Sequence, residues 1–240
     1  MEQCIPSFDI EEINIYGIEN EIIECILRNL YKYTNLKKFI CSNYQFKSSK
    51  LPKLPNSLIV LYCSRCNLKE LPENLPISLK EIYCSLNRIR ELPKELPNEL
   101  INLDCSNNFL KKLPKLPNSL KHLDCCNNSL KELPKKLPDE LFTLFCIDNY
   151  LNDFDNFPDL PDTLSNLMCP LTTTIFTTED QINTIRNQQS KNRNCKRLNI
   201  LNRNLLLEWS AMIIMNPKRI ERLLESGEIN FFDDSFSSLT

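Results

Sequence analysis

Cysteine is the residue type in this sequence most suggestive of chemistry. The 240 residues include twelve cysteines but only one histidine, His122, and two glycines, Gly17 and Gly227. Cys63 and Cys66 form a Cys-x-x-Cys pair, a spacing typical of metal or redox sites. So few histidines and glycines leave no Ser-His-Asp arrangement, no metal-binding histidine pair and no glycine-rich phosphate loop. We therefore expect no enzymatic activity and no cofactor.

The cysteines belong to a repeated pattern, which determines where they would lie in the fold. The pattern is L-x-x-L-x-C-x-x-N-x-L-x-x-L-P, and residues 79–93 and 100–114 are two copies offset by 21 residues. A fixed period in the twenties is typical of a solenoid of stacked coils. Seven copies can be traced, weaker at both ends, and their first leucines are Leu36, Leu58, Leu79, Leu100, Leu120, Leu141 and Leu164.

Within each copy, the spacing of apolar residues predicts one short strand followed by a turn. Leu103 and Cys105 are two residues apart and so share one face of the strand, while Asp104 points the other way. Asn108 ends this alternation, because an asparagine side chain can satisfy backbone groups in a tight turn. Leu-Pro pairs such as Leu92-Pro93 disfavour helices and central strands, so we expect extended, proline-rich return segments.

This pattern resembles the leucine-rich repeat family. The short period and the paired prolines of Leu71-Pro72 and Leu75-Pro76 are similar to the LPX-type class. That class occurs in secreted effectors of bacterial pathogens, and similar repeats occur in large DNA viruses. The resemblance covers residues 36–170 and implies an α/β repeat solenoid with short parallel strands, a proline-rich convex side and a concave binding face. Cysteine stands where the family usually has leucine or valine.

The repeat offers a structural explanation for the cysteines. Seven occupy the same inward position, which would place them about 4.8 Å apart in a column on stacked strands. Buried thiols behave as small apolar groups, and such a column suits a reducing compartment, the cytoplasm or a host cytoplasm. Cys66 takes the turn position of Asn87, and there is no second Cys-x-x-Cys, so we expect no metal site. The column consists of Cys41, Cys63, Cys84, Cys105, Cys125, Cys146 and Cys169.

The segments on either side of the array, which spans residues 36–170, are predicted to be helical. In residues 1–35, apolar residues at helical spacing predict a helix at about 20–33 that would cap the first repeat. Residues 171–240 are expected to form a C-terminal helical appendage that begins near residue 179 and ends in an acidic, serine-rich tail. No apolar run is long enough to span a membrane, and the first residues lack an apolar signal core.

Strand residues that point away from the core are the candidate binding site. Asp104 and Asp124 fall on adjacent strands, where their carboxylates would repel each other unless a partner's lysine or arginine lay between them. Aromatic side chains on both sides could anchor apolar groups. We therefore predict a protein or peptide partner with a basic centre; the alternative is a solvated face with incidental aromatics. The predicted partner-binding residues are Tyr62, Tyr83, Asn102, Asp104, His122, Asp124, Phe145 and Met168.

Two other functions stay open beside a non-enzymatic scaffold or adaptor. Residues 186–203 hold six basic and no acidic residues, which could contact nucleic acid, although such a run is more often a solvated helix face or linker. The net charge of −2 does not favour nucleic acid as the main partner. Effector ligases with LPX-type repeats carry a larger catalytic domain with a C-x-D motif. Cys195 lacks that aspartate, so we do not carry the activity over, and a degenerate relative of these ubiquitin ligases is the second alternative.

Overall fold

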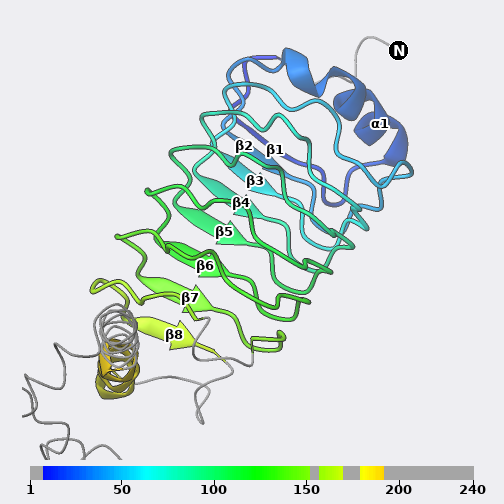
Figure 1. Ribbon diagram of the computed structural model, residues 1–240. Coiled ribbons are helices and arrows are strands. Elements are labelled where there is room, and N and C mark those ends of the chain that lie inside the picture. Colours follow the sequence, from blue (N-terminus) through cyan, green and yellow to red (C-terminus); the bar gives the residue numbers. More distant parts are fainter. Residues whose placement is uncertain (1–7, 152–156, 170–178, 192–240) are drawn as a thin grey trace, which may run out of the picture. The chain divides into compact units, whose positions relative to one another are not determined.

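The fold is a coil of repeats that each contribute one strand to a parallel sheet. The structure, a computed structural model, describes residues 8–151, 157–169 and 179–191. The chain divides into two units, residues 1–189 and 190–240, and all the repeats lie in the first. Within it, eight parallel strands follow one another in chain order (Figure 1). They are β1 (Glu12–Asn14), β2 (Lys38–Ile40), β3 (Val60–Tyr62), β4 (Glu81–Tyr83), β5 (Asn102–Asp104), β6 (His122–Asp124), β7 (Thr143–Phe145) and β8 (Asn166–Met168).

The strands coincide with the repeats expected from the sequence. Each strand from β2 to β8 begins two residues after the first leucine of its copy. In β5 the middle residue, Leu103, is buried, whereas Asn102 and Asp104 on either side are only half-buried. Neighbouring strands pair without a shift, so that Leu103 lies beside Ile82 and Leu123. The predicted inward and outward assignments are therefore confirmed.

Strand β1 was not expected from the sequence. It pairs in parallel with β2, placing Ile13 beside Phe39, and so extends the sheet beyond the first recognisable copy. Ile13 and Ile15 are both buried. Their spacing of two residues is the signal of a strand face that could have revealed it. The expectation of helix alone before residue 36 was thus incomplete.

The helix predicted at about 20–33 is present as α1 (Asn20–Asn29), followed by the 3-10 helix η2 (Leu30–Lys32). It lies at the end of the sheet that holds β1 and β2 (Figure 1). Ile23 and Ile26 are buried and belong to the same core cluster as Phe39. Glu21 in the first turn and Arg28 in the last complement the helix dipole.

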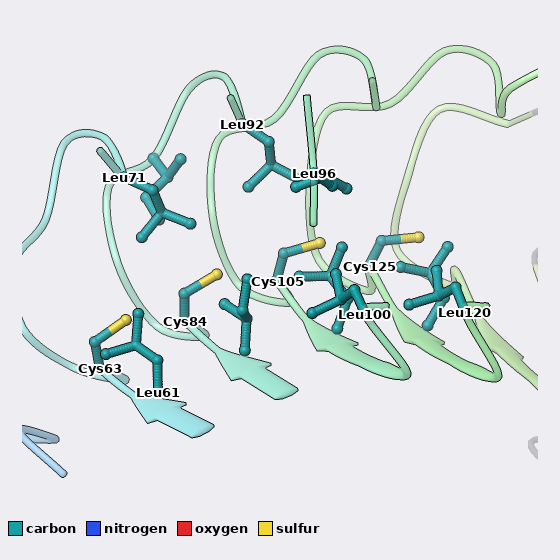
Figure 2. Close-up of a cluster of buried hydrophobic side chains, with 14 of the residues drawn as sticks. Leu61, Cys63, Leu71, Cys84, Leu92, Leu96, Leu100, Cys105, Leu120 and Cys125 are labelled. Carbon is teal, nitrogen blue, oxygen red and sulfur yellow. The ribbon is translucent and has the colours of Figure 1, made fainter. Parts of the chain in front are cut away.

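The core fills the space between the sheet and the return segments. Figure 2 shows leucines from both sides, such as Leu61 and Leu96, pointing into this space beside a row of sulfur atoms. All seven cysteines of the predicted column are at most 1% exposed, which confirms their inward position. The return segments between β3 and β7 contain no helix or strand. Leu92 and Leu96, each followed by proline, turn inward and are buried.

A ladder of asparagine side chains closes the turns after β4, β5, β6 and β7 and connects successive coils. The Nδ2 group of Asn108 donates to the carbonyl oxygens of Cys84, Cys105 and Ser106 at 3.0 to 3.1 Å. Its Oδ1 accepts the backbone N–H of Ile89 at 3.0 Å. The carbonyl of Cys84 also accepts from Asn87, so amides and carbonyls alternate along the coil axis. This asparagine ladder consists of Asn87, Asn108, Asn128 and Asn149.

Hydroxyl groups form a second ladder at the start of the repeats, one that the sequence did not reveal. The side chain of Ser78 donates to the carbonyls of Asn56 and Leu58 in the preceding coil, at 2.6 and 2.8 Å. Ser119 and Thr163 make the equivalent pairs of bonds. These bonds satisfy carbonyls that the short strands leave unpaired, which stabilises coil stacking.

Residues 179–191 form a helix, close to where the C-terminal appendage was expected to begin. Ile182 and Ile185 are buried on one side of it. The guanidinium of Arg186 donates to the carbonyls of Pro161 and Leu164. These contacts join the helix to the segment that leads into β8.

The buried thiols should be chemically inert in the folded protein. The thiolate is the reactive form of cysteine, and burial raises the pKa of Cys84, Cys105 and Cys125. We expect iodoacetamide to leave these thiols unmodified in mildly alkaline native buffer and to modify them after denaturation, as measured by peptide mass spectrometry. Cys25, which is partly exposed, is the internal reference. Equal native labelling of Cys25 and Cys105 would contradict a closed core.

Candidate functional site

The predicted partner-binding residues lie on adjacent strands of one sheet face. The strand register places Tyr62 beside Tyr83, Asp104 beside Asp124, and Phe145 beside Met168. It also places Asn102 beside His122, each two residues before the aspartate of the same strand. Because adjacent strands are about 4.8 Å apart, these side chains form two continuous rows. We refer to the surface they make as the strand face.

Two carboxylates stand at the centre of the strand face. Asp104 Oδ1 accepts the backbone N–H of Ser106 at 3.0 Å and its hydroxyl at 2.7 Å. Asp124 Oδ1 accepts the backbone N–H of Cys126 at 3.0 Å. Burial raises the pKa of Asp124, the charge of Asp104 raises it further, and the hydrogen bonds from Cys126 oppose this shift. The electrostatic cost of ionising Asp124 would therefore fall if a cation lay beside it.

A shallow depression of about 350 Å³ surrounds these carboxylates. Six of the eight predicted residues line it, and Tyr62 and Met168 do not. No lysine or arginine is among the lining residues, so its charged groups are the two carboxylates. The lining consists of Tyr83, Asn102, Leu103, Asp104, His122, Leu123, Asp124, Thr143 and Phe145.

Tyr62 and Tyr83 form an aromatic platform next to the depression. Their rings stack with centroids 4.5 Å apart and planes 4° from parallel. The Tyr83 hydroxyl donates to Glu81 Oε2 at 2.9 Å, and burial together with this carboxylate raises the pKa of Tyr83 to about 12. Tyr83 therefore remains a neutral donor at physiological pH. The Lys38 ammonium lies 5.9 Å from the Tyr62 ring centroid and 3.3 Å from Glu12.

On the other side of the depression, His122 is exposed, as expected from its outward position. Its Nδ1 lies 3.1 Å from the hydroxyl of Thr143, and its ring meets Phe142 edge-on at 6.0 Å. Thr143 also accepts a hydrogen bond from Asn166 at 3.4 Å. Sequence reasoning left Thr143, Glu81 and Lys38 out of the site, although the strand register already placed them on this face.

Cys63 and Cys66 follow β3 directly, Cys63 in the cysteine column and Cys66 in the turn. Within the described residues, no group of three or more His, Cys, Asp or Glu side chains could hold a metal ion. The Cys66 thiol donates to the carbonyl of Cys41 at 2.9 Å, as Asn87 donates to the carbonyl of Cys63 at 2.8 Å. A hydrogen bond with the Cys41 side chain lowers the pKa of Cys66, against the effect of burial. Cys66 thus substitutes for asparagine in the ladder, as the register predicts.

The basic segment 186–203 is described only as far as residue 191. Its first cation, Arg186, is bonded to carbonyl oxygens and to Asn183 Oδ1, so it is engaged within the fold. The other basic residues beyond Lys191, as well as Cys195, lie outside the described residues. None of the helices that the structure describes is both long and apolar enough to cross a membrane.

No family model and no curated protein matches the chain. Among solved structures, it is similar to YopM, a leucine-rich effector protein from Yersinia pestis, with 30% identity over 58% of this chain and 46% of that chain, at a TM-score of 0.47. YopM from Yersinia enterocolitica gives 30% identity, coverage of 57% and 38%, and a TM-score of 0.42. The leucine-rich repeat domain of a Shigella effector is 27% identical over 67% of this chain and 66% of that chain, at a TM-score of 0.49. The match spans less than half of either YopM chain.

The type of fold is evident from the chain's own repeats. Each copy supplies one short parallel strand whose central residue, a leucine, isoleucine or phenylalanine, is buried. In four of the copies an asparagine after the strand closes the turn and bonds to the preceding coil. The recurring sequence pattern, the coil with one strand per copy and the asparagine ladder together give this chain a leucine-rich repeat fold.

Proposed function

We propose that this protein is a non-enzymatic scaffold or adaptor that binds a protein or peptide partner on its strand face. The observation that carries the proposal is the central depression, whose charged groups are the carboxylates of Asp104 and Asp124. Burial and, to a smaller extent, the charge of Asp104 raise the pKa of Asp124, and a lysine or arginine of the partner would oppose both effects. Repeat proteins commonly use the extended surface of their stacked strands for binding.

The flanking side chains suggest the rest of the partner's chemistry. Tyr62 and Tyr83 offer a flat aromatic surface on one side of the carboxylates, and Phe145 and Met168 offer apolar groups on the other. From β3 to β8 the face spans five strand spacings, roughly 24 Å. An extended peptide of roughly seven residues covers this distance. We therefore propose a partner segment with a central cation and an apolar residue towards each end.

We also propose that the protein works in a reducing compartment. All ten described cysteines are present as thiols, and all seven in the column are at most 1% exposed. Close neighbours in such a column would tend to form disulfides in an oxidising environment. The fold uses them instead as packing groups between leucines.

Neutralising the central carboxylates tests the proposal. We expect the double variant Asp104→Asn, Asp124→Asn to weaken partner binding at least about tenfold, because a charge pair at a partly desolvated site is lost. Asparagine retains the Oδ1 acceptors, so folding should be preserved. The measurement is quantitative mass spectrometry of captured proteins, followed by titration calorimetry with the purified partner.

The matched control is Glu91→Gln, Glu132→Gln, which makes the same charge change at two exposed positions on the return side. It should leave partner capture unchanged. If the aspartate variant captures the same partners at the same affinity as the wild type, the central carboxylates do not recognise the partner. Equal losses in both double variants would indicate a general charge effect instead.

A further inference from the structure

A second surface lies at the edge of the sheet, in the turns that follow the strands. An open depression of about 460 Å³ crosses four successive turns there. Its charged groups are the guanidiniums of Arg65 and Arg88, and its apolar groups are Leu86 and Phe109. We call these four residues the turn-edge surface. The amide side chains that complete the lining are Asn43, Gln45, Asn67 and Asn87.

Two of these residues occupy strained backbone positions. The second residue after each column cysteine from Cys41 to Cys146 adopts positive φ, and at four of these six turns it is asparagine or aspartate, residues that tolerate this conformation. Arg65 (φ 59°) and Leu86 (φ 56°) are the exceptions. Their backbone N–H groups bond to the carbonyls of Ser85 and Ser106 in the next coil, so the fold imposes the conformation. The four regular residues are Asn43, Asn107, Asn127 and Asp148.

Strain of this kind clusters at functional sites, and here it coincides with unusual exposure. Leu86 is 42% exposed and Phe109 is 54% exposed, although both are large apolar residues. Neither Arg65 nor Arg88 forms an ion pair with any residue that the structure describes. No acidic side chain lines this depression, whereas no lysine or arginine lines the central depression of the strand face.

We propose that the turn-edge surface binds an acidic peptide segment with an apolar residue next to its carboxylates. Arginine guanidiniums pair with carboxylates through charge-assisted hydrogen bonds, and Arg65 and Arg88 face the same depression from adjacent turns. Leu86 and Phe109 would receive the apolar side chain. Nucleic acid fits less well, because its affinity comes from many phosphate contacts and the lining offers only two cations.

The repeats themselves supply substitutions that should preserve the fold. Arg65→Asn and Leu86→Asn introduce the residue that other turns carry at that position, and Arg88→Gln introduces the residue of Gln45. We expect the pair Arg65→Asn, Arg88→Gln to weaken binding of a fluorescein-labelled Phe-Asp-Asp-Phe-Asp-Asp peptide about tenfold or more in fluorescence anisotropy. Leu86→Asn should also weaken it.

Stability distinguishes recognition from a structural role. Because asparagine relieves the strained φ, Arg65→Asn and Leu86→Asn should raise the melting temperature while they lower peptide affinity. If these residues had a structural role, the same substitutions would lower both the melting temperature and the peptide affinity. The control pair Lys111→Gln, Lys131→Gln removes two exposed cations from the return side and should not change peptide binding. The Asp104→Asn, Asp124→Asn variant should also bind the acidic peptide normally, which separates this inference from the proposed function.

Four results would overturn the inference. The first is no binding of the acidic peptide by the wild-type protein up to the peptide's solubility limit. The second is equal binding of a Phe-Lys-Lys-Phe-Lys-Lys peptide. The third is the same loss of affinity in the Lys111→Gln, Lys131→Gln control. The fourth is polyuridylate binding that depends more strongly on Arg65 and Arg88 than peptide binding does, which would assign the surface to nucleic acid.

Discussion

Asn108→Ala is expected to lower the free energy of unfolding by about 2–4 kcal/mol. The substitution removes four hydrogen bonds, and the backbone N–H of Ile89 loses its partner inside the core. The three carbonyls lose one donor each, and the cost is limited because the Cys84 and Cys105 carbonyls keep the bonds from Asn87 and Asn128. Urea denaturation followed by circular dichroism measures the change.

Asn108→Asp removes the hydrogen-bond donor of the side chain while its size and shape stay the same. A carboxylate keeps an acceptor for Ile89 but places negative charge against three carbonyl oxygens, so the loss at neutral pH should equal or exceed that of alanine. The new carboxyl should have a folded-state pKa above its unfolded value, since burial and these oxygens disfavour its charge. Its destabilisation is then complete above the folded pKa and decreases as the pH falls through it.

The control for these variants is Asn98→Ala, at an exposed position outside the ladder. It should change the free energy of unfolding by less than about 0.5 kcal/mol. A similar loss for Asn98→Ala and Asn108→Ala would mean that the ladder contributes no more than an exposed polar residue. If the loss of unfolding free energy in Asn108→Asp did not depend on pH, the side chain at position 108 would not be buried against carbonyl oxygens.

The repeating part of the fold could be read from the sequence because each inward position is constrained by packing. Leu103 and Cys105 repeat what Ile82 and Cys84 do one coil earlier, so a single period determines both strand position and register. Strand β1 was not predicted, because its coil lacks the cysteine and the asparagine of the repeat and keeps only the alternation of Ile13 and Ile15. A strand of three residues is too short to stand out without them.

Surface chemistry was less predictable, since it depends on positions that the repeat leaves variable. The register correctly placed Asp104 beside Asp124, but it could not show that Lys38 lies near the ring of Tyr62. The turn-edge surface was missed for the same reason. Arg65 and Leu86 occupy a position that the motif treats as free, and only the backbone shows that this position has positive φ.

Leu103→Ala is expected to lower the free energy of unfolding by about 2–5 kcal/mol, the range for removing a buried leucine side chain and leaving a cavity. Leu103 is 1% exposed, lies at the centre of β5 and sits between Ile82 and Leu123 in the strand register. Neighbouring coils surround it on both sides, so they can fill the space only by shifting the stack. Chemical denaturation monitored by circular dichroism checks the size of the loss.

The adjacent residue supplies the control, because Asp104 occupies the opposite face of the same strand. Asp104→Asn keeps an oxygen that can accept the two hydrogen bonds from Ser106, so its effect should stay below about 1 kcal/mol. In a strand, alternate residues point to opposite sides, and this contrast therefore tests the assignment of core and binding face directly. Equal losses for Leu103→Ala and Asp104→Asn would reverse that assignment and remove the basis for a recognition role of the strand face.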